Sequence, residues 1–168
     1  MSGHRYDVLA IVDAATLLSE YPDASKDADT PSPIDGRYIH ILSPGDDGQV
    51  AHNDGQIFTG LSVGDDLHLR ETALALRAEV SVLFVRFALN DPDIVSPVEP
   101  QIRDVDVPVP NFDDLFQPKS QPMKDHFWHS TVLAAGKTTC MADLAVLDRD
   151  GAVLGYFRWE ASVVIVGN

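Results

Sequence analysis

The chain has a single cysteine, few basic residues and no long apolar stretch. Because Cys140 has no second cysteine to pair with, the fold does not depend on an oxidising compartment. The N-terminal apolar run, residues 8–12, is shorter than a signal-peptide core, and no run approaches the roughly 18 residues of a membrane span. We therefore expect a cytoplasmic protein without membrane insertion; export without a cleaved signal peptide is the alternative.

Basic residues are scarce, since 12 Lys and Arg stand against 26 Asp and Glu and give a formal net charge of −14. Proteins that bind nucleic acid or anionic membranes concentrate Lys and Arg at the contact, so this balance argues against both partners. The acidity is uneven: residues 1–60 and 61–118 each carry a net charge of −7, whereas residues 119–168 are neutral. The acidic residues are therefore expected in loops of the first 118 residues.

What the chain does have is alternation of apolar and polar residues, which is typical of β-strands. Residues 6–12 form an apolar run expected to be buried on both faces, and residues 14–20 follow as a short helix capped by Asp13. A parity change among the leucines from residue 67 to 76 predicts a bulge or break near residues 71–73. Further strands are expected over residues 38–42, 80–89, 127–133, 138–147, 152–159 and 163–166.

Two of these predicted segments make more specific predictions. Residues 80–89 are apolar at both parities, which favours a central strand in which Arg86 must find a partner or reach solvent. In residues 152–159, Phe157 and Trp159 share one parity and are expected in the core, so that Tyr156 and Arg158 point outward.

Residues 91–122 hold seven of the eleven prolines. Proline cannot donate to a sheet ladder, so we expect a long extended excursion with at most an edge strand near residues 102–109. The segment is too rich in apolar residues to stay free in water, which points to a contact arm. The sequence as a whole predicts an all-β fold: a single-domain antiparallel β-sandwich over residues 1–168, with one short helix near the N-terminus and this proline-rich arm.

Motifs for catalysis are weak. Gly136-Lys137-Thr138-Thr139 lacks the earlier glycine and the following helix of a phosphate-binding loop, so it is interpreted as a hairpin turn. Among the six histidines, His126 and His129 fall on opposite faces of one strand, whereas His40 and His68 are candidates to meet across a sheet.

Clustered carboxylates in turns, beside exposed aromatic and basic side chains, are the candidate ligand-binding features. Such turns are ordinary loop chemistry, but several carboxylates together also bind calcium, and calcium-assisted sugar binding uses this arrangement on β-sandwiches. The sequence predicts no cofactor, with calcium as the alternative, and no metal-binding residue is assigned. The candidate residues are Asp46, Asp47, Asp54, Asp65, Asp66, Tyr156 and Arg158.

Three separated stretches resemble the AidA/PixA family of bacterial inclusion-body proteins. They are DVLAIVD at residues 7–13 with TLL at 16–18 and YP at 21–22, GDDL at 64–67 with Arg70, and GYFRW at 155–159. The resemblance implies a non-enzymatic accessory protein, made at high cell density and in some members under quorum-sensing control, that accumulates in inclusions or aids host interaction. It carries over no catalytic residue. With only three methionines, this chain departs from the methionine-rich branch of the family.

The sequence therefore predicts a self-associating, non-enzymatic protein that forms homo-oligomers through the 91–122 arm and the neutral C-terminal strands. The alternative is a carbohydrate-binding, lectin-like module with a glycan ligand, assisted by calcium. An undetected hydrolase or metal-dependent activity is a third hypothesis, which requires a pocket where histidine and carboxylate converge.

Overall fold

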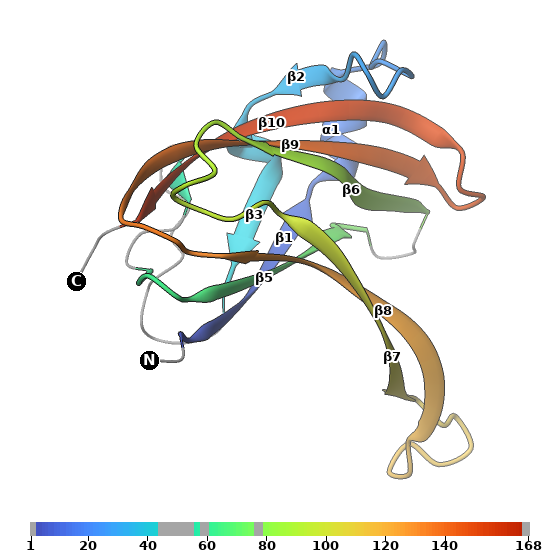
Figure 1. The fold of residues 1–168 in the computed structure, drawn as a ribbon. Helices are drawn as coiled ribbons and strands as arrows, with labels where there is room; N and C mark the ends of the chain where they lie inside the picture. Colours follow the sequence, from blue (N-terminus) through green and yellow to red (C-terminus); the bar gives the residue numbers. More distant parts are fainter. Residues whose placement is uncertain (1–2, 44–55, 58–60, 76–78, 166–168) are drawn as a thin grey trace.

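The computed structural model describes residues 3–43, 56–57, 61–75 and 79–165, and it consists of two facing β-sheets with a long hairpin that projects from one of them (Figure 1). The first sheet has the strand order β3-β1-β5-β8-β7 and the second has the order β2-β10-β9-β6. The strands of the first sheet are β1 (Arg5–Val12), β3 (Ile39–Leu42), β5 (Asp66–Ala73), β7 (Glu99–Val109) and β8 (Lys119–Thr131). Those of the second are β2 (Ser32–Ile34), β6 (Val80–Leu89), β9 (Gly136–Asp148) and β10 (Val153–Ile165), and β4 (Gln56–Ile57) pairs with β10.

The core lies between the two sheets and is filled by alternate residues of their strands. Phe157 and Trp159 of β10 are buried in it, as their parity predicts, together with Leu144 of β9 and Val12 of β1. In β1 only alternate residues are buried, so the expectation that this strand is buried on both faces is wrong. The all-β sandwich is confirmed, although the β1–β5 and β10–β2 pairs are parallel.

The predicted helix is α1 (Ala14–Glu20), and Asp13 caps it. An Asp13 carboxylate oxygen accepts a hydrogen bond of 3.1 Å from the backbone N–H of Thr16, which satisfies one of the free donors of the first turn. The helix buries Ala14 and Leu17 in the core, and a short 3-10 helix, η1 (Gly36–Tyr38), leads into β3. Among the described residues, no helix is long and apolar enough to cross a membrane.

Strand β6 corrects the expectation for residues 80–89. It forms a strand as predicted, but it lies at the edge of its sheet, where β9 is its neighbour in the described part of the chain. Its apolar residues occur at both parities because Leu83 and Val85 face outward and remain exposed, and because the register with β9 shifts between Phe84 and Arg86. The exposed Leu83 and Val85 therefore gave β6 the sequence pattern that is typical of a central strand.

Strand β5 shows no bulge near residues 71–73. It keeps an unbroken parallel register with β1 up to Ala73, where the strand ends. The predicted bulge requires Leu74 to be buried, whereas its side chain is exposed just beyond the strand. The break therefore falls at the end of the strand and not within it.

The proline-rich segment is more regular than the sequence predicted. β7 is an edge strand, as expected near residues 102–109, but it pairs with β8 in an antiparallel hairpin whose register runs from Glu99 opposite His129 to Val109 opposite Lys119. β8 consequently begins at Lys119 and not at residue 127. Residues 128–131 of β8 pair with β5, whereas residues 119–127 do not, so the far half of the hairpin extends away from the body as a two-stranded arm (Figure 1). The prolines fit because each strand of the arm has one unpaired side.

Candidate functional site

The sequence-predicted residues that lie in the described part of the chain fall in separate places. Asp65 and Asp66 precede and begin β5 in the first sheet, whereas Tyr156 and Arg158 belong to β10 in the second. Asp46, Asp47 and Asp54 lie outside the described residues. The carbohydrate-binding alternative therefore stays a prediction.

Asp65 has a structural role. Its side chain is buried and accepts hydrogen bonds from two backbone N–H groups, that of His4 at 2.9 Å and that of Ser62 at 2.7 Å. These bonds tie the N-terminal segment to the turn before β5, where Gly64 has a positive φ of 92°. Both carboxylate oxygens are thereby occupied by the backbone.

Asp66 is engaged by two side chains of β8. Its Oδ1 accepts a hydrogen bond of 2.8 Å from the hydroxyl of Thr131 and lies 3.2 Å from Nε2 of His129. The Thr131 hydrogen bond lowers the pKa of Asp66, burial opposes this, and His129 adds to the lowering. In the described part of the chain, no three His, Cys, Asp or Glu side chains are placed to hold a metal ion.

Arg158 and Arg86 share one buried carboxylate, that of Asp143 in β9. Arg158 binds it through Nε at 2.6 Å and through a terminal nitrogen at 2.8 Å, and Nε of Arg86 binds it at 2.7 Å. Arg86 also donates to the carbonyl of Ala28 at 2.7 Å, so the partner that the sequence required for Arg86 is present. This cluster joins β6, β9 and β10 to the loop before β2.

Cys140 lines the narrow apolar space between the sheets, beside Leu89 and Val163. Burial raises the pKa of its thiol to about 12, so the reactive thiolate is not formed at neutral pH. The two histidines of β8 separate as predicted, since His126 lies 3.0 Å from Glu71 and His129 faces Asp66. His40 aligns with Ile11 across β1 and does not meet His68, which aligns with Asp7.

A cavity of about 640 Å³ that the sequence did not predict lies on the outer face of the first sheet. Three of the eight arginines line it, namely Arg5 of β1, Arg70 of β5 and Arg103 of β7, and we call this cavity the arginine cup. Leu9 and Leu42, which are paired across β1 and β3, add an apolar wall. Each of these arginines lies two positions from another polar residue of its strand. This alternation was the sequence signal that the arginine side chain faces outward.

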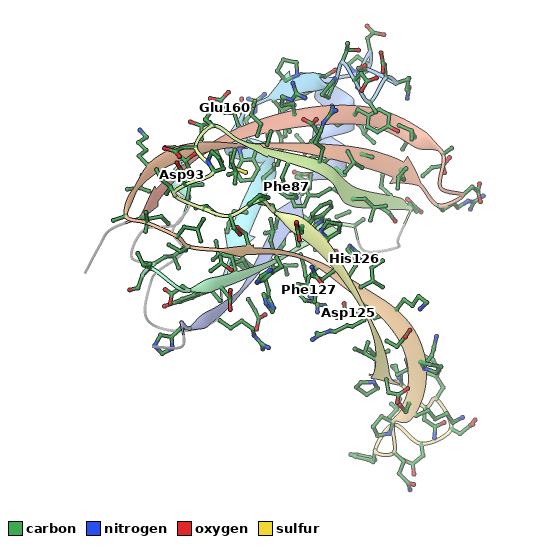
Figure 2. All side chains as sticks on the ribbon, viewed as in Figure 1. Phe87, Asp93, Asp125, His126, Phe127 and Glu160 are labelled. Carbon is green, nitrogen blue, oxygen red and sulfur yellow. The ribbon has the colours of Figure 1, made fainter. Side chains whose placement is uncertain are left out.

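Asp125 holds two of these arginines in place. Its Oδ2 accepts hydrogen bonds from Arg70 at 2.5 Å and from Nε of Arg103 at 2.9 Å, and its side chain is largely buried beneath them. Burial opposes ionisation of Asp125, but the hydrogen bonds from Arg103 and Arg70 outweigh it and hold its pKa below the ordinary value. Figure 2 shows Asp125 beside Phe127, where β8 leaves the body and enters the arm.

His68 lines the cup and stacks on Phe127, with 4.4 Å between the ring centroids. Burial lowers the pKa of His68, and the nearby Asp7 only partly offsets this effect. The imidazole is therefore neutral at neutral pH, and the positive charge of the cup comes from its arginines.

Comparison with known proteins places the chain in a family. The family model described as PixA, inclusion body protein, matches residues 4–165. Among solved structures, the crystal structure of an inclusion body protein (PixA) from Burkholderia cenocepacia J2315 is similar with a TM-score of 0.79 and 19% identity, over 99% of this chain and 98% of that one. No curated protein matches the chain. Since the family model spans nearly the entire sequence, the chain belongs to the PixA family of inclusion body proteins.

Proposed function

We propose that this protein is a non-enzymatic accessory protein of the PixA type that self-associates through its projecting hairpin arm. Self-association into homo-oligomers supplies the step by which such a chain accumulates in cytoplasmic inclusions, and it requires no cofactor. The proposal includes production at high cell density and a role in host interaction, because the family resemblance implies both. The observation that carries it is the apolar tip of the arm.

The tip of the arm exposes large apolar side chains that one copy of the chain does not cover. Phe112 is 90% exposed and Phe116 is 96% exposed, and Leu115 between them is also exposed. These residues lie in the loop that joins β7 to β8, at the greatest distance from the body (Figure 1). Aromatic residues grouped on a projecting surface are typical of protein–protein contacts, where they become buried anchors.

The body offers an apolar acceptor surface at a different place. Leu83 and Val85 of the edge strand β6 face outward and are 40% and 44% exposed. A tip that packs against β6 of the next copy makes a heterologous contact, because the two surfaces differ. Contacts of this kind build open assemblies when the rotation between copies does not close, which suits a protein that accumulates in inclusions.

The test measures the mass of the assembly in solution. Sedimentation velocity of the unaltered chain should show oligomers that grow with concentration, and the double variant Phe112→Ser, Phe116→Ser should sediment mainly as a monomer. The single variant Leu83→Ser should also weaken association, since it alters the proposed acceptor. Val63→Ser is the matched control, because Val63 is exposed but lies outside the arm and outside β6.

A strictly monomeric unaltered chain at high concentration would contradict the proposal. So would an assembly whose mass is unchanged by the double substitution at the tip. Circular dichroism of each variant checks that the sandwich is intact, which is expected because the substituted side chains are exposed.

A further inference from the structure

The arginine cup differs in charge from the rest of the molecule. The chain carries a net charge of −14, yet the three arginines of the cup outnumber its carboxylates, which are Asp7 in the lining and Asp125 beneath Arg70 and Arg103. The positive groups converge there from three strands, β1, β5 and β7, that are far apart in the sequence. A local positive field in an acidic protein attracts an anion to that one place.

Two of the guanidinium groups are fixed before any ligand arrives. Asp125 binds Arg70 and Arg103 through single nitrogens, and the Arg103 guanidinium also lies over the ring of Phe127, 5.4 Å from its centroid. An arginine has five N–H donors, so each group keeps donors beyond the bond to Asp125. Side chains that are already ordered lose less conformational entropy on binding, which favours affinity.

The one carboxylate that lines the cup is already partnered. Arg5 binds Asp7 at 3.0 Å, and Nδ1 of His68 lies 3.6 Å from the other Asp7 oxygen. The positive charge least balanced within the cup is therefore on the side of Arg70 and Arg103, where two guanidiniums share the single carboxylate of Asp125. An incoming anion is favoured on that side.

Size and polarity restrict the ligand further. The cavity of about 640 Å³ lies within the range of roughly 300–1,000 Å³ that is typical of small-molecule sites. Leu9 and Leu42 provide an apolar wall for the uncharged part of the ligand. A long polyanion is disfavoured, because the chain as a whole carries a net charge of −14 and repels further negative charges.

We propose that the arginine cup binds a small organic anion, in which a carboxylate or phosphate group contacts Arg70 and Arg103 and an apolar body lies against Leu9 and Leu42. Guanidinium groups bind both kinds of anion with paired hydrogen bonds, which is the chemistry the two ligands share. This inference goes beyond self-association, since it concerns the outer face of the first sheet and uses neither the arm tip nor β6.

The experiment uses three probes of similar size: benzoate, phenyl phosphate and the neutral benzyl alcohol. Each is titrated into the ¹⁵N-labelled full chain, and chemical-shift changes give its dissociation constant. At least one of the two anions should bind saturably and shift the signals of β1, β5 and β7, and benzyl alcohol should not bind. Comparison of benzoate with phenyl phosphate tells whether the site favours a carboxylate or a phosphate. Binding should weaken when the salt concentration is raised, because the attraction is electrostatic.

Two variants identify the groups responsible. Arg103→Gln should weaken binding of the anion by about tenfold or more, the range expected on loss of charge-assisted hydrogen bonds. Arg5→Gln should also weaken it, and this variant keeps the fold because Arg5 and its partner Asp7 are both more than half exposed. Arg149→Gln is the matched control, since it removes the same charge from an exposed turn far from the cup in sequence.

Several results would overturn the proposal. One is the absence of saturable binding by both anions, and another is binding of benzyl alcohol as tight as that of benzoate. Equal affinity of the Arg103→Gln, Arg5→Gln and Arg149→Gln variants for the anion would also overturn it. Repeating the titrations on the Phe112→Ser, Phe116→Ser variant separates anion binding from self-association, because neither substituted residue lines the cup.

Discussion

At the scale of single residues, Asp143 is the most consequential polar group. It is only 2% exposed and lies in the middle strand of three, where Arg86 of β6 and Arg158 of β10 both bind its carboxylate. Burial opposes ionisation of Asp143, but the hydrogen bonds from Arg158 and Arg86 outweigh it, and the pKa of Asp143 lies below its ordinary value. A single side chain therefore ties together three strands and the loop that contains Ala28.

Replacement of this carboxylate should destabilise the fold. We expect Asp143→Asn to lower the free energy of unfolding by about 2–3 kcal/mol at pH 7, less than the roughly 3–5 kcal/mol for a fully buried pair, because both arginines remain partly exposed. Urea denaturation measures the difference. Asp150→Asn is the control, because Asp150 is 82% exposed, and its effect should stay within about 0.5 kcal/mol.

Asp143 and two further carboxylates make the stability of the fold depend on pH. The pKa values of Asp66, Asp125 and Asp143 are lowered in the folded chain, so in acid the unfolded state binds more protons than the folded state. Their contribution is complete above the unfolded pKa of about 4 and is lost as the pH falls through the lower, folded values.

Thermal unfolding from pH 7 to pH 2.5 checks this expectation. The midpoint should fall steeply below about pH 4, and the difference between the unaltered chain and Asp143→Asn should shrink there, because protonation removes the charge that the variant lacks. A difference that stays constant down to the lowest pH would show that Asp143 contributes through packing and not through its charge.

At the scale of elements, the hairpin of β7 and β8 divides into a base and an arm. The base pairs with β5 and carries Trp128, whose ring packs against Phe87 of the second sheet. The outer part pairs only within itself, and its residues from Val105 to Met123 contribute none of the buried core residues. The arm is therefore a surface element, and we expect the body to fold without it.

Shortening the arm tests this division. Replacement of residues 105–123 by Asn-Gly keeps Arg103 opposite Asp125 and Asp104 opposite Lys124, and Asn-Gly is suited to a two-residue hairpin turn. We expect the midpoint of thermal unfolding to change by no more than a few degrees while self-association is lost. A large loss of stability would show that the arm supports the core.

These elements also show where a single sequence is sufficient. The helix after Asp13 and the inward parity of Phe157 and Trp159 depend on residues close together in the chain, and they are confirmed. The central position expected for β6 was wrong, because an exposed apolar residue and a buried one look alike in sequence. The long hairpin was not predicted, because the prolines of residues 91–122 argued against strands. They are tolerated there since one side of each strand is unpaired.

At the scale of the whole molecule, the charge of −14 opposes the association that the apolar tip favours. Like charges on two copies repel each other over a distance set by the salt concentration, about 10 Å at 0.1 M. Salt weakens this repulsion, whereas it leaves the burial of apolar surface intact or strengthens it.

Self-association should therefore increase when sodium chloride is raised from about 0.02 M to 0.3 M. Sedimentation velocity at the two concentrations measures the change, and the variant Phe112→Ser, Phe116→Ser should remain monomeric in both. Weaker association at high salt would indicate that ion pairs and not the apolar tip join the copies. Binding of an anion to the arginine cup should show the opposite salt dependence.

The sequence by itself determined the all-β class, the helix cap, the core parity of the C-terminal strands and the family to which the chain belongs, because these depend on local patterns. Only the tertiary structure decided the arginine cup, since Arg5, Arg70 and Arg103 meet through the parallel pairing of β1 with β5 and the antiparallel pairing of β8 with its neighbours. The choice of strand neighbours is made by burial across the entire sandwich. The strand neighbours therefore cannot be predicted from any short stretch of the sequence.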